Sequence, residues 1–341
     1  MTAPPVRISL APGREAREPP EARGLSRDAV RLLVGGRDGV SHHRFTELPD
    51  LLAAGDVLVV NRSATLPAAL DVTGTDLVVH VSTRRPDGSW LVELRRRRDP
   101  AAATEPYPGG AVGDRLRLTG GATLTLRSRR SGGRLWTAVL DADPVPSYLL
   151  AHGRPIRYGY VERDWPLSAY QTVFGTQPGS AEMPSASRPF TTELVTRLVT
   201  AGVGFAPVTL HTGVASLEKP EPPYPEWYAV PPTSARLVTQ ARAAGGRVIA
   251  VGTTATRAIE TVAAPDGSIR AGSGWTDLVI TPQRGVRAVD GLLTGFHEPR
   301  SSHLQLLSAV AGRALLARCY AEAAAQGYRW HEFGDLNLLL P

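Results

Sequence analysis

The hydrophobic pattern changes within the chain, and this change limits the possible folds more than any other feature. Between residues 64 and 140 apolar and polar residues alternate in short runs, and no helical period interrupts them. The runs are DLVVHVST, SWLVELR, DRLRLTG, ATLTLRS and RLWTAVL, separated by turn-forming stretches such as RPDGS and TGG. Short strands at this spacing are typical of a small β-barrel or sandwich.

Helices and strands alternate on both sides of this region. A hairpin around GGRDG precedes a short helix and an apolar strand that ends at Asn61, and later strands end at His211 and in DLVITP. TTELVTRLVTAG reads as a helix with Thr and Glu in its first turn and a glycine stop, and PTSARLVTQARAAGG reads as a helix with a Thr or Ser cap and Gly at its end. Residues 301–327 read as one long helix or two. Such alternation favours a mostly parallel sheet covered on both faces.

We therefore predict an α/β fold: a mostly parallel sheet domain built from both chain ends, with an inserted small β-barrel domain. The expected α/β domain comprises residues 25–63 and 147–341, and the barrel comprises residues 64–146. Residues 1–24 are rich in Pro, Glu and Arg, so we expect them to be poorly ordered.

Composition excludes several classes of protein. Hydrophobic residues make up 42% of the chain, which is enough for a large core. No apolar run approaches the ~18 residues that span a bilayer, and the N-terminus lacks an apolar signal core, so we expect a cytoplasmic protein with no membrane partner. Cys319 is the single cysteine, which excludes a disulfide framework, and His42 and His43 have no ligand at metal-binding spacing, so we expect no metal. No pattern indicates an oligomeric state.

The net charge of +6 is compatible with a polyanionic partner. Basic runs at 95–98 and 127–130 lie inside the predicted barrel. They are either solvated faces of the strands or contacts to a nucleic-acid backbone.

The stretch RVIAVGTTATRAIETVA, residues 247–263, reads as a buried strand, a turn rich in Gly and Thr, and a helix. Backbone N–H groups at a helix start can hold a carboxylate or phosphate, and Thr254 could cap the helix. The glycine and lysine spacings of a phosphate-binding loop or a dinucleotide site are missing. The stretch is either an anion site or an ordinary tight corner.

Two further stretches have the character of functional loops. Residues 170–194 form a long segment of small residues and prolines within an otherwise compact half of the chain. His297 precedes a helix start in LLTGFHEPRSSHLQLL. A histidine there suits proton transfer or anion contact, although a capping or surface role is equally compatible with the pattern.

Seven motifs in order carry a resemblance over most of the chain. They are LPDLLAAGDVLVVNRSATLPAAL, YQTVF, GGRVIAVGTTATRAIE, GSGWTDLVITP, VDGLLTGFH, LLSAVAG and YRWHEFGDLNLLL. Together they resemble the S-adenosylmethionine:tRNA ribosyltransferase-isomerase family of queuosine biosynthesis, from about Arg31 to the C-terminus.

The resemblance implies an α/β domain with a β-barrel inserted near its N-terminal third. It also implies S-adenosylmethionine as a substrate, no metal or redox cofactor, and the tRNA anticodon stem-loop as a partner. The reaction implied transfers and rearranges the ribosyl part of S-adenosylmethionine onto an aminomethyl-deazaguanine base in tRNA. Its products are epoxyqueuosine, adenine and methionine.

The matching motifs give candidate residues for each task. Candidates for proton transfer are His297, His211, Glu182 and Glu298. Candidates for contact with S-adenosylmethionine are Tyr170, Gln171, Ser180, Gly252, Thr253, Thr254, Arg257, Trp275, Thr276 and Phe296. Of these, Arg257 and the Gly252–Thr254 turn would hold methionine's carboxylate, Trp275 would stack on adenine, and Phe296 and His297 would flank the sugar. Candidates for RNA contact are Arg95, Arg96, Arg97 and Arg300.

The chain departs from the family pattern at several of these motifs. Pro189 stands where GSVAAPTAGLHFT has histidine, and Tyr224 stands where MHSEWY has histidine. Glu182 and Glu298 are additional carboxylates, and the tail FFSYGDAML appears as WHEFGDLNL. These changes leave two alternatives to the tRNA enzyme: a diverged ribosyl transferase or lyase that acts on a small molecule, and a non-catalytic protein that binds RNA or a nucleotide.

Overall fold

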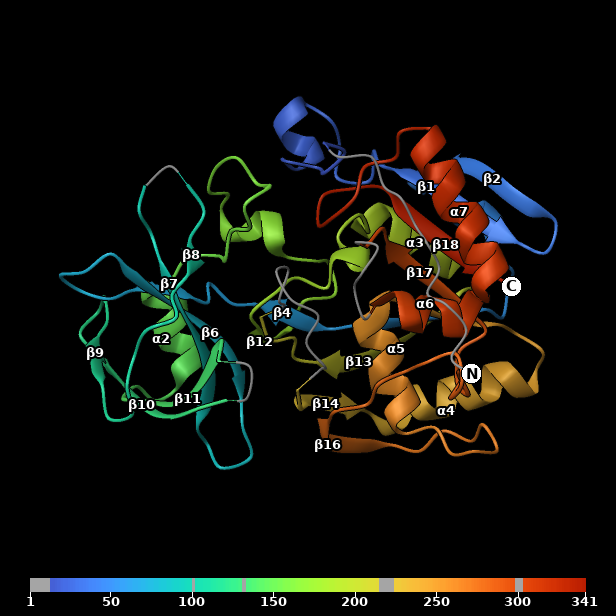
Figure 1. Cartoon of the computed structure of the whole chain (residues 1–341). Coiled ribbons are helices and arrows are strands. Elements are labelled where there is room, and N and C mark those ends of the chain that lie inside the picture. Colours follow the sequence, from blue (N-terminus) through green and yellow to red (C-terminus); the bar gives the residue numbers. More distant parts are fainter. Residues whose placement is uncertain (1–12, 100–101, 131–132, 215–223, 298–302) are drawn as a thin grey trace.

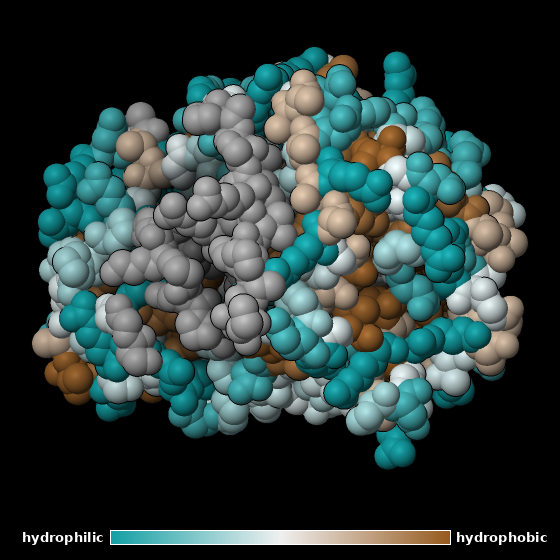
Figure 2. Space-filling view, turned by 45° about the vertical axis from the view of Figure 1, so that its right-hand side comes forward, coloured by the Kyte–Doolittle hydropathy of each residue, from teal (hydrophilic) through white to brown (hydrophobic). Residues whose placement is uncertain are grey.

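The computed structural model describes residues 13–99, 102–130, 133–214, 224–297 and 303–341. These residues form a large sheet covered by helices and a smaller curled sheet beside it, and a short two-stranded sheet lies between them (Figure 1). Polar residues cover much of the face in Figure 2 and break its apolar surface into separate areas. Within the described ranges, no helix is both long and apolar enough to cross a membrane.

The large sheet has nine strands in the order β16-β14-β13-β3-β15-β17-β18-β1-β2. The strands are β1 (Arg31–Gly36), β2 (Gly39–Arg44), β3 (Val57–Asn61), β13 (Gly204–Leu210), β14 (Glu226–Val230), β15 (Val248–Val251), β16 (Gly272–Thr276), β17 (Gly291–Gly295) and β18 (Leu336–Leu340). Strands from both ends of the sequence therefore share one sheet.

The predicted mostly parallel arrangement is correct only for the centre of the sheet. Strands β13, β3, β15 and β17 are parallel to their neighbours in this group. Strand β18 then runs antiparallel to β17 and parallel to β1, while the edge strands β2, β14 and β16 pair antiparallel. The sheet is mixed because its edges are built from antiparallel neighbours, with the predicted hairpin forming the β1–β2 edge.

The central strands are buried on both faces, as their continuous apolar runs predict. Val57 and Val59 of β3 belong to one hydrophobic cluster, while Leu58 and Val60 belong to the other. Helices α4 (Pro232–Ala243), α5 (Gly252–Thr261), α6 (His303–Ala311) and α7 (Arg313–Ala325) contribute to the first cluster. Helices α1 (Leu48–Leu51) and α3 (Thr192–Thr200) contribute to the second, together with the 3-10 turns η2 (Phe45–Glu47) and η4 (Ser185–Ser187).

The inserted region forms an antiparallel sheet that surrounds its own hydrophobic cluster. Its strands are β5 (Ala69–Asp71), β6 (Leu77–Arg84), β7 (Trp90–Arg96), β8 (Glu105–Pro106), β9 (Arg115–Arg117), β10 (Thr123–Arg129) and β11 (Leu135–Leu140). All five predicted alternating runs are strands. An isolated bridge between Val72 and Leu118 joins the two ends of the strand path, which accounts for the curl. Helix α2 (Val145–His152) packs Val145 and Leu149 on this sheet, although residues from 147 onward were expected in the other domain.

The two sheets meet at a short parallel pair, β4 (Ser63–Thr65) with β12 (Gln177–Ser180). Strand β4 follows β3 after one residue, so the chain passes directly from the centre of the large sheet into the inserted region. The 3-10 turn η3 (Leu167–Tyr170) lies against β4, because Thr65 Oγ1 donates to the Tyr170 carbonyl at 2.7 Å.

Several local predictions need correction. DLVITP is not a strand; the sheet edge is β16 just before it. Thr191 caps α3 by accepting from Leu194 N at 3.1 Å, but no side chain caps α4, because Ser234 Oγ instead donates to the Pro207 carbonyl. Of the two possibilities left open for residues 301–327, the described part forms two helices, α6 and α7, separated at Gly312 with its φ of 72°.

The N-terminal segment also differs from its prediction over its described part. Residues 13–24 include the 3-10 turn η1 (Pro20–Arg23), Ala16 is buried, and Glu21 pairs with Arg188 at 3.0 Å. These contacts anchor a segment whose composition alone indicated disorder. Residues 1–12 lie outside the described residues.

Candidate active site at the carboxyl edge of the large sheet

Four adjacent parallel strands, β13, β3, β15 and β17, end at the same edge of the large sheet. The residues that follow them are His211, Arg62 and Ser63, Gly252, and Phe296 with His297. Because β18 runs antiparallel to β17, the turn that enters β18 reaches this edge too. Ligands of open α/β sheets bind outside the carboxyl ends of strands. We name this region the carboxyl edge.

At one end of the carboxyl edge, a hydroxyl pair holds His211. Ser63 Oγ hydrogen-bonds to His211 Nδ1 at 2.7 Å and to Ser180 Oγ at 2.6 Å. The imidazole stacks on Trp227 with ring centroids 5.2 Å apart, and a Cβ on Gly179 would lie 2.4 Å from the ring. Burial lowers the pKa of His211 to about 4. The imidazole is therefore neutral near pH 7 and can accept a proton.

At the centre of the carboxyl edge, Gly252 starts α5 with a φ of +88°, a conformation that favours glycine. The predicted cap by Thr254 is wrong, because no side chain caps this helix and Thr254 Oγ1 instead accepts from Asn61 Nδ2 at 3.1 Å. Thr253 and Thr254 are half-buried. The helix start thus remains a candidate anion site through its backbone N–H groups.

Arg257 does not have the contacts expected for holding methionine's carboxylate. Its guanidinium forms an ion pair with Glu226 and donates to the carbonyls of Leu278 and Thr276 at 3.2 and 3.3 Å. Glu226 in turn accepts from Gly213 N at 2.8 Å. The guanidinium of Arg257 is therefore already paired with the carboxylate of Glu226. Its contacts connect α5 to β14, to the end of β16 and to the segment after it.

At the other end of the carboxyl edge, His297 hydrogen-bonds to Thr294 Oγ1 at 3.0 Å, and its backbone N–H donates to Tyr320 Oη at 3.1 Å. Its ring stacks on His303 with centroids 4.5 Å apart. Burial, aided by His303 and His331, holds the pKa of His297 well below its usual range. His297 is therefore also neutral near pH 7. It follows β17, three strand spacings from β13, so it lies roughly 14 Å from His211 along the edge.

Three predicted ligand contacts are structural contacts in this fold. Phe296 is 2% exposed and packs edge-on against Tyr320 and Tyr328, so it belongs to the core. The side chain of Gln171 bonds to the backbone of Thr65 in the way that a neighbouring strand would. Its Oε1 accepts from Thr65 N at 3.0 Å, and its Nε2 donates to the Thr65 carbonyl at 2.8 Å. The buried Tyr170 ring packs on Phe333, with centroids 5.5 Å apart.

Trp275 and Thr276 lie on the edge strand β16. Trp275 is 40% exposed, pairs across the strands with Trp227, and donates from Nε1 to the Arg84 carbonyl at 3.3 Å. Thr276 is buried and hydrogen-bonds to Thr261 Oγ1 at 2.7 Å. Trp275 therefore lies at the His211 end of the carboxyl edge, beside the inserted sheet.

Tyr224 connects the two sheets where the family pattern has histidine. Its hydroxyl donates to the Val214 carbonyl at 2.7 Å and hydrogen-bonds to Ser82 Oγ at 2.8 Å. Burial raises the pKa of Tyr224, and the charges of Glu226 and Glu182 raise it further. Glu182 thus lies near this junction, at the His211 end. Glu298 and Arg300 lie outside the described residues.

Sequence reasoning missed the turn His331–Glu332, which enters β18. His331 stacks on Tyr160 with centroids 4.1 Å apart, and its backbone N–H donates to the Phe296 carbonyl at 3.5 Å. Burial raises the pKa of Glu332 to about 7, and Glu332 Oε2 has no hydrogen-bond partner in the described structure. The difference between WHEFGDLNL in this chain and FFSYGDAML in the family pattern was the sequence signal that could have identified this turn.

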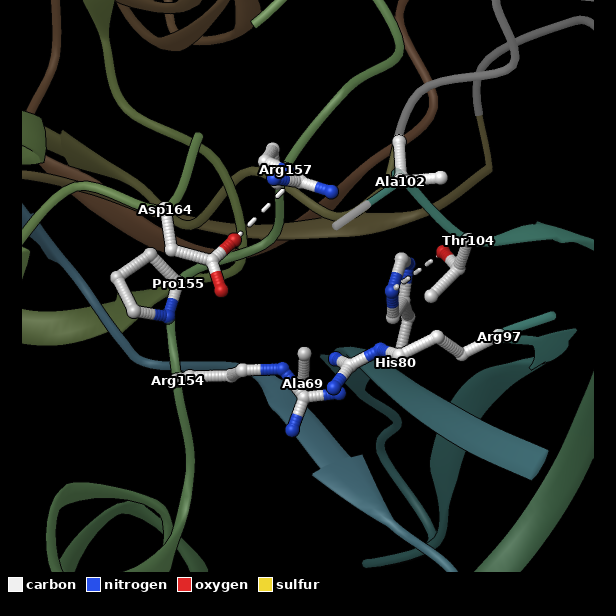
Figure 3. Close-up of a pocket in the computed structure, with 10 residues that line it drawn as sticks. Ala69, His80, Arg97, Ala102, Thr104, Arg154, Pro155, Arg157 and Asp164 are labelled. Carbon is white, nitrogen blue, oxygen red and sulfur yellow. Dashed lines mark hydrogen bonds and ion pairs between the residues drawn. The ribbon is translucent and has the colours of Figure 1, made fainter. Parts of the chain in front are cut away.

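The three predicted RNA-contacting arginines that the structure describes lie on and just after β7, and each has an acidic partner. Arg95 pairs with Glu93 at 2.8 Å, Arg96 with Asp76 at 2.9 Å, and Arg97 with Asp71 at 3.9 Å. Arg97 also lines a pocket between the inserted sheet and the segment 154–164 (Figure 3).

No group of His, Cys, Asp and Glu in the described ranges is arranged to hold a metal ion. The groups along the carboxyl edge are two neutral imidazoles at its opposite ends, an uncapped helix start between them, and the Glu332 carboxyl group of raised pKa beside His331. Such an arrangement suits proton transfer on an extended ligand with an anionic group.

Comparisons with known proteins agree over almost the whole chain. Residues 7–339 match the family described as "Queuosine biosynthesis protein". An S-adenosylmethionine:tRNA ribosyltransferase-isomerase of Moorella thermoacetica is 37% identical over 97% of each chain. One of Symbiobacterium thermophilum is 37% identical over 92% of this chain and 94% of its own. The crystal structure of S-adenosylmethionine tRNA ribosyltransferase from Thermotoga maritima superimposes with a TM-score of 0.54 and 29% identity, covering 98% of this chain and 99% of that one. The chain belongs to the queuosine biosynthesis protein family.

Proposed function

We propose that this protein transfers and isomerises the ribosyl moiety of S-adenosylmethionine onto an aminomethyl-deazaguanine base in tRNA, which gives epoxyqueuosine and releases adenine and methionine. One observation carries the proposal: a ribosyltransferase-isomerase is 37% identical over 97% of both chains. Similarity over the full length includes the inserted sheet and the carboxyl edge, which a shared fold alone would not require.

The reaction needs proton transfer and a closed site more than it needs a cofactor. The sulfonium of S-adenosylmethionine acidifies the neighbouring ribose CH, so a base can remove that proton. Expulsion of adenine opens the sugar to attack by the amine, and closure of the epoxide expels methionine. The protein must supply a base, a proton donor for adenine and a site that excludes water.

We assign the base to His297, supported by its place directly after β17 at the carboxyl edge and its hydrogen bond to Thr294. A neutral imidazole can accept a proton without first losing one. His211, with Ser63 and Ser180, is the second proton-transfer candidate at the opposite end, and Glu182 lies near it. Glu298 keeps its predicted role as a carboxylate beside His297 in the sequence.

We place the methionine carboxylate at the start of α5, where backbone N–H groups of the Gly252–Thr254 turn favour an anion. Arg257 acts indirectly, since its ion pair with Glu226 positions the helix. Trp275 remains the candidate to stack on adenine, because it is the exposed aromatic residue near His211.

The inserted region, in this proposal, is a small β-barrel domain that meets the acceptor tRNA. Its strand path and the Val72–Leu118 bridge support closure of the sheet. Arg95 and Arg96 end β7, Arg97 follows directly after it, and Arg300 comes shortly after His297 in the sequence. RNA phosphates would compete with the acidic partners of these arginines.

Mass spectrometry of the reaction products tests this function. The protein is incubated with S-adenosylmethionine, with and without an anticodon stem-loop that contains the aminomethyl-deazaguanine base. We expect adenine, methionine and an epoxyqueuosine-containing RNA only when both substrates are present. Adenine release with a free deazaguanine nucleoside but not with RNA would replace this function with small-molecule ribosyl transfer. No adenine with any acceptor would support a binding protein instead.

A further inference from the structure

The pocket of Figure 3 lies between the inserted sheet and the segment that returns from it to the large sheet. Arg97 comes from the end of β7 and Arg154 from the segment after α2, and their guanidinium groups reach into the same part of the pocket (Figure 3). The enclosed part of the cavity is small, about 10 Å³, and the rest of its space of about 290 Å³ is open to solvent. His80 forms part of its wall, with Thr104 at 3.4 Å from its Nε2.

The two arginines of this pocket differ in how closely they pair with Asp71. Arg154 donates to both oxygens of Asp71 at 2.5 and 2.7 Å, which is the bidentate geometry of a strong ion pair. Arg97 shares the same carboxylate, but its nearest approach is 3.9 Å, beyond hydrogen-bonding distance. One carboxylate therefore serves two guanidinium groups, and that of Arg97 keeps donors available.

The charges of three arginines act on the neighbouring histidine, His80. His80 is 4% exposed, and burial together with the charges of Arg95, Arg154 and Arg134 holds its pKa well below the usual range. The imidazole therefore stays neutral and adds no charge of its own. Positive potential in a partly enclosed site of low dielectric attracts anions strongly.

The pocket is close to the carboxyl edge. Arg157 and Asp164, which pair at 3.3 Å, line its far wall. Burial raises the pKa of Tyr170, and the charges of Glu332, Asp164 and Arg157 act on it as well. Tyr170 is bonded through its carbonyl to β4, the strand that leaves the carboxyl edge. A group bound in the pocket thus lies beside the route from the inserted sheet to the reaction site.

We infer that the Arg97–Arg154 pocket seats one phosphate group of the acceptor RNA and fixes the strand whose base enters the carboxyl edge. The inference rests on the proposed function, because it names where that function's acceptor is held. Arg97 makes the principal contact through its available guanidinium donors, and Arg154 adds charge while it stays paired with Asp71. Guanidinium groups suit phosphate because their donors match two of its oxygens.

Salt-dependent binding of the anticodon stem-loop tests this inference in the full-length protein. Arg97→Gln should weaken binding roughly 10-fold and reduce the slope of log K against log salt by about one, as expected for the loss of one phosphate contact. The matched control is Arg98→Gln, because Arg98 is adjacent, 71% exposed and paired with Glu105 outside the pocket. Equal losses of RNA affinity in the two variants would indicate general attraction to a basic surface and would overturn the inference that the pocket binds a phosphate.

A second variant works in the opposite direction. Asp71→Asn removes the carboxylate that both arginines share, so it should tighten RNA binding while leaving the fold intact, as checked by circular dichroism. Weaker binding by a folded Asp71→Asn protein would contradict the inference. A variant that unfolds cannot mimic the expected gain.

Modified RNA identifies the source of the anion. Replacing one backbone phosphate at a time with a neutral methylphosphonate should reveal a position at which wild type and Arg97→Gln bind equally. The absence of such a position, or binding of inorganic phosphate that leaves RNA affinity unchanged, would show that the pocket holds free phosphate rather than RNA. Release of adenine by the wild type is measured separately, so failure of the pocket and failure of the proposed function give different results.

Discussion

At the scale of single residues, the two histidines of the carboxyl edge differ in what holds them. His211 is fixed by a hydroxyl pair and an indole, whereas His297 is fixed by Thr294, Tyr320 and a second imidazole. Both are kept neutral by burial. The sequence identified His211 at the end of an apolar strand and His297 on a loop before a helix start, but it could not supply the partners that set their protonation.

Changing His297 to Ala should lower turnover roughly 100-fold or more, because a positioned base contributes about that factor. S-adenosylmethionine affinity should change little, since the side chain acts on the proton and the helix start holds the carboxylate. Adenine release under saturating substrates measures the effect. His43→Ala is the control, because His43 lies on β2 and contacts Ser41 and Glu47. A His297→Ala enzyme with wild-type turnover would remove the residue from the reaction.

Glu332 should make stability depend on pH. Burial raises the pKa of this carboxyl from 4.5 to about 7 in the folded protein. The folded protein then binds a proton that the unfolded chain has released, so stability falls as pH rises between those values. The facing groups are Tyr160, Tyr170 and Arg188, of which Arg188 is already paired with Glu21.

Glu332→Gln removes this titration. Urea denaturation between pH 5 and pH 8 should show a wild-type decline of up to about 3 kcal/mol from this group, and a correspondingly smaller decline in the variant. Above pH 7 the variant should be the more stable protein. Glu322→Gln, at a half-buried position on α7 where the carboxylate pairs with His42, is the control. Parallel curves for wild type and Glu332→Gln would show that the carboxyl is not held in its protonated form.

At the scale of elements, local sequence patterns predicted most strands and helices. They could not predict which strands pair with one another or which distant side chains meet. The five alternating runs became strands, and the Gly-Thr-Thr stretch became a strand-to-helix corner. By contrast, β18 inserts between β17 and β1 through contacts across the whole sequence. Likewise, Arg257 meets Glu226 only because β14 lies beside α5 in the fold.

Gly252 tests whether the corner is an anion site or an ordinary turn. Gly252→Ala should destabilise the fold by about 1–2 kcal/mol, because alanine is strained at a φ of +88°. Its Cβ would also lie 3.3 Å from Ala186, shifting the helix start. We therefore expect a raised KM for S-adenosylmethionine in addition to lower stability.

Gly245→Ala provides the matched comparison. Gly245 has a φ of +81°, and an added Cβ would meet no atom within 4 Å. This variant should have a similar loss of stability in urea denaturation but an unchanged KM. Identical KM values for the two variants would indicate that the corner is an ordinary turn and that the methionine carboxylate binds at another place.

At the scale of the whole molecule, the insertion point explains why the site lies where it does. The inserted sheet leaves the large sheet just after β3, at the middle of the carboxyl edge, and its strand β6 lies against β12 and β14. Tyr224 with Ser82 and Trp275 with the Arg84 carbonyl connect the two sheets at one end. The sequence revealed the insertion through its change of period, whereas these connections depend on tertiary contacts that no local pattern contains.

The central claim is that S-adenosylmethionine binds along the carboxyl edge, and a crystal structure of the protein with this substrate tests it most directly. We predict density that extends between His211 and His297, with the methionine carboxylate at the N–H groups of the Gly252–Thr254 turn. A ligand bound in another part of the molecule, with the carboxyl edge empty, would contradict the account.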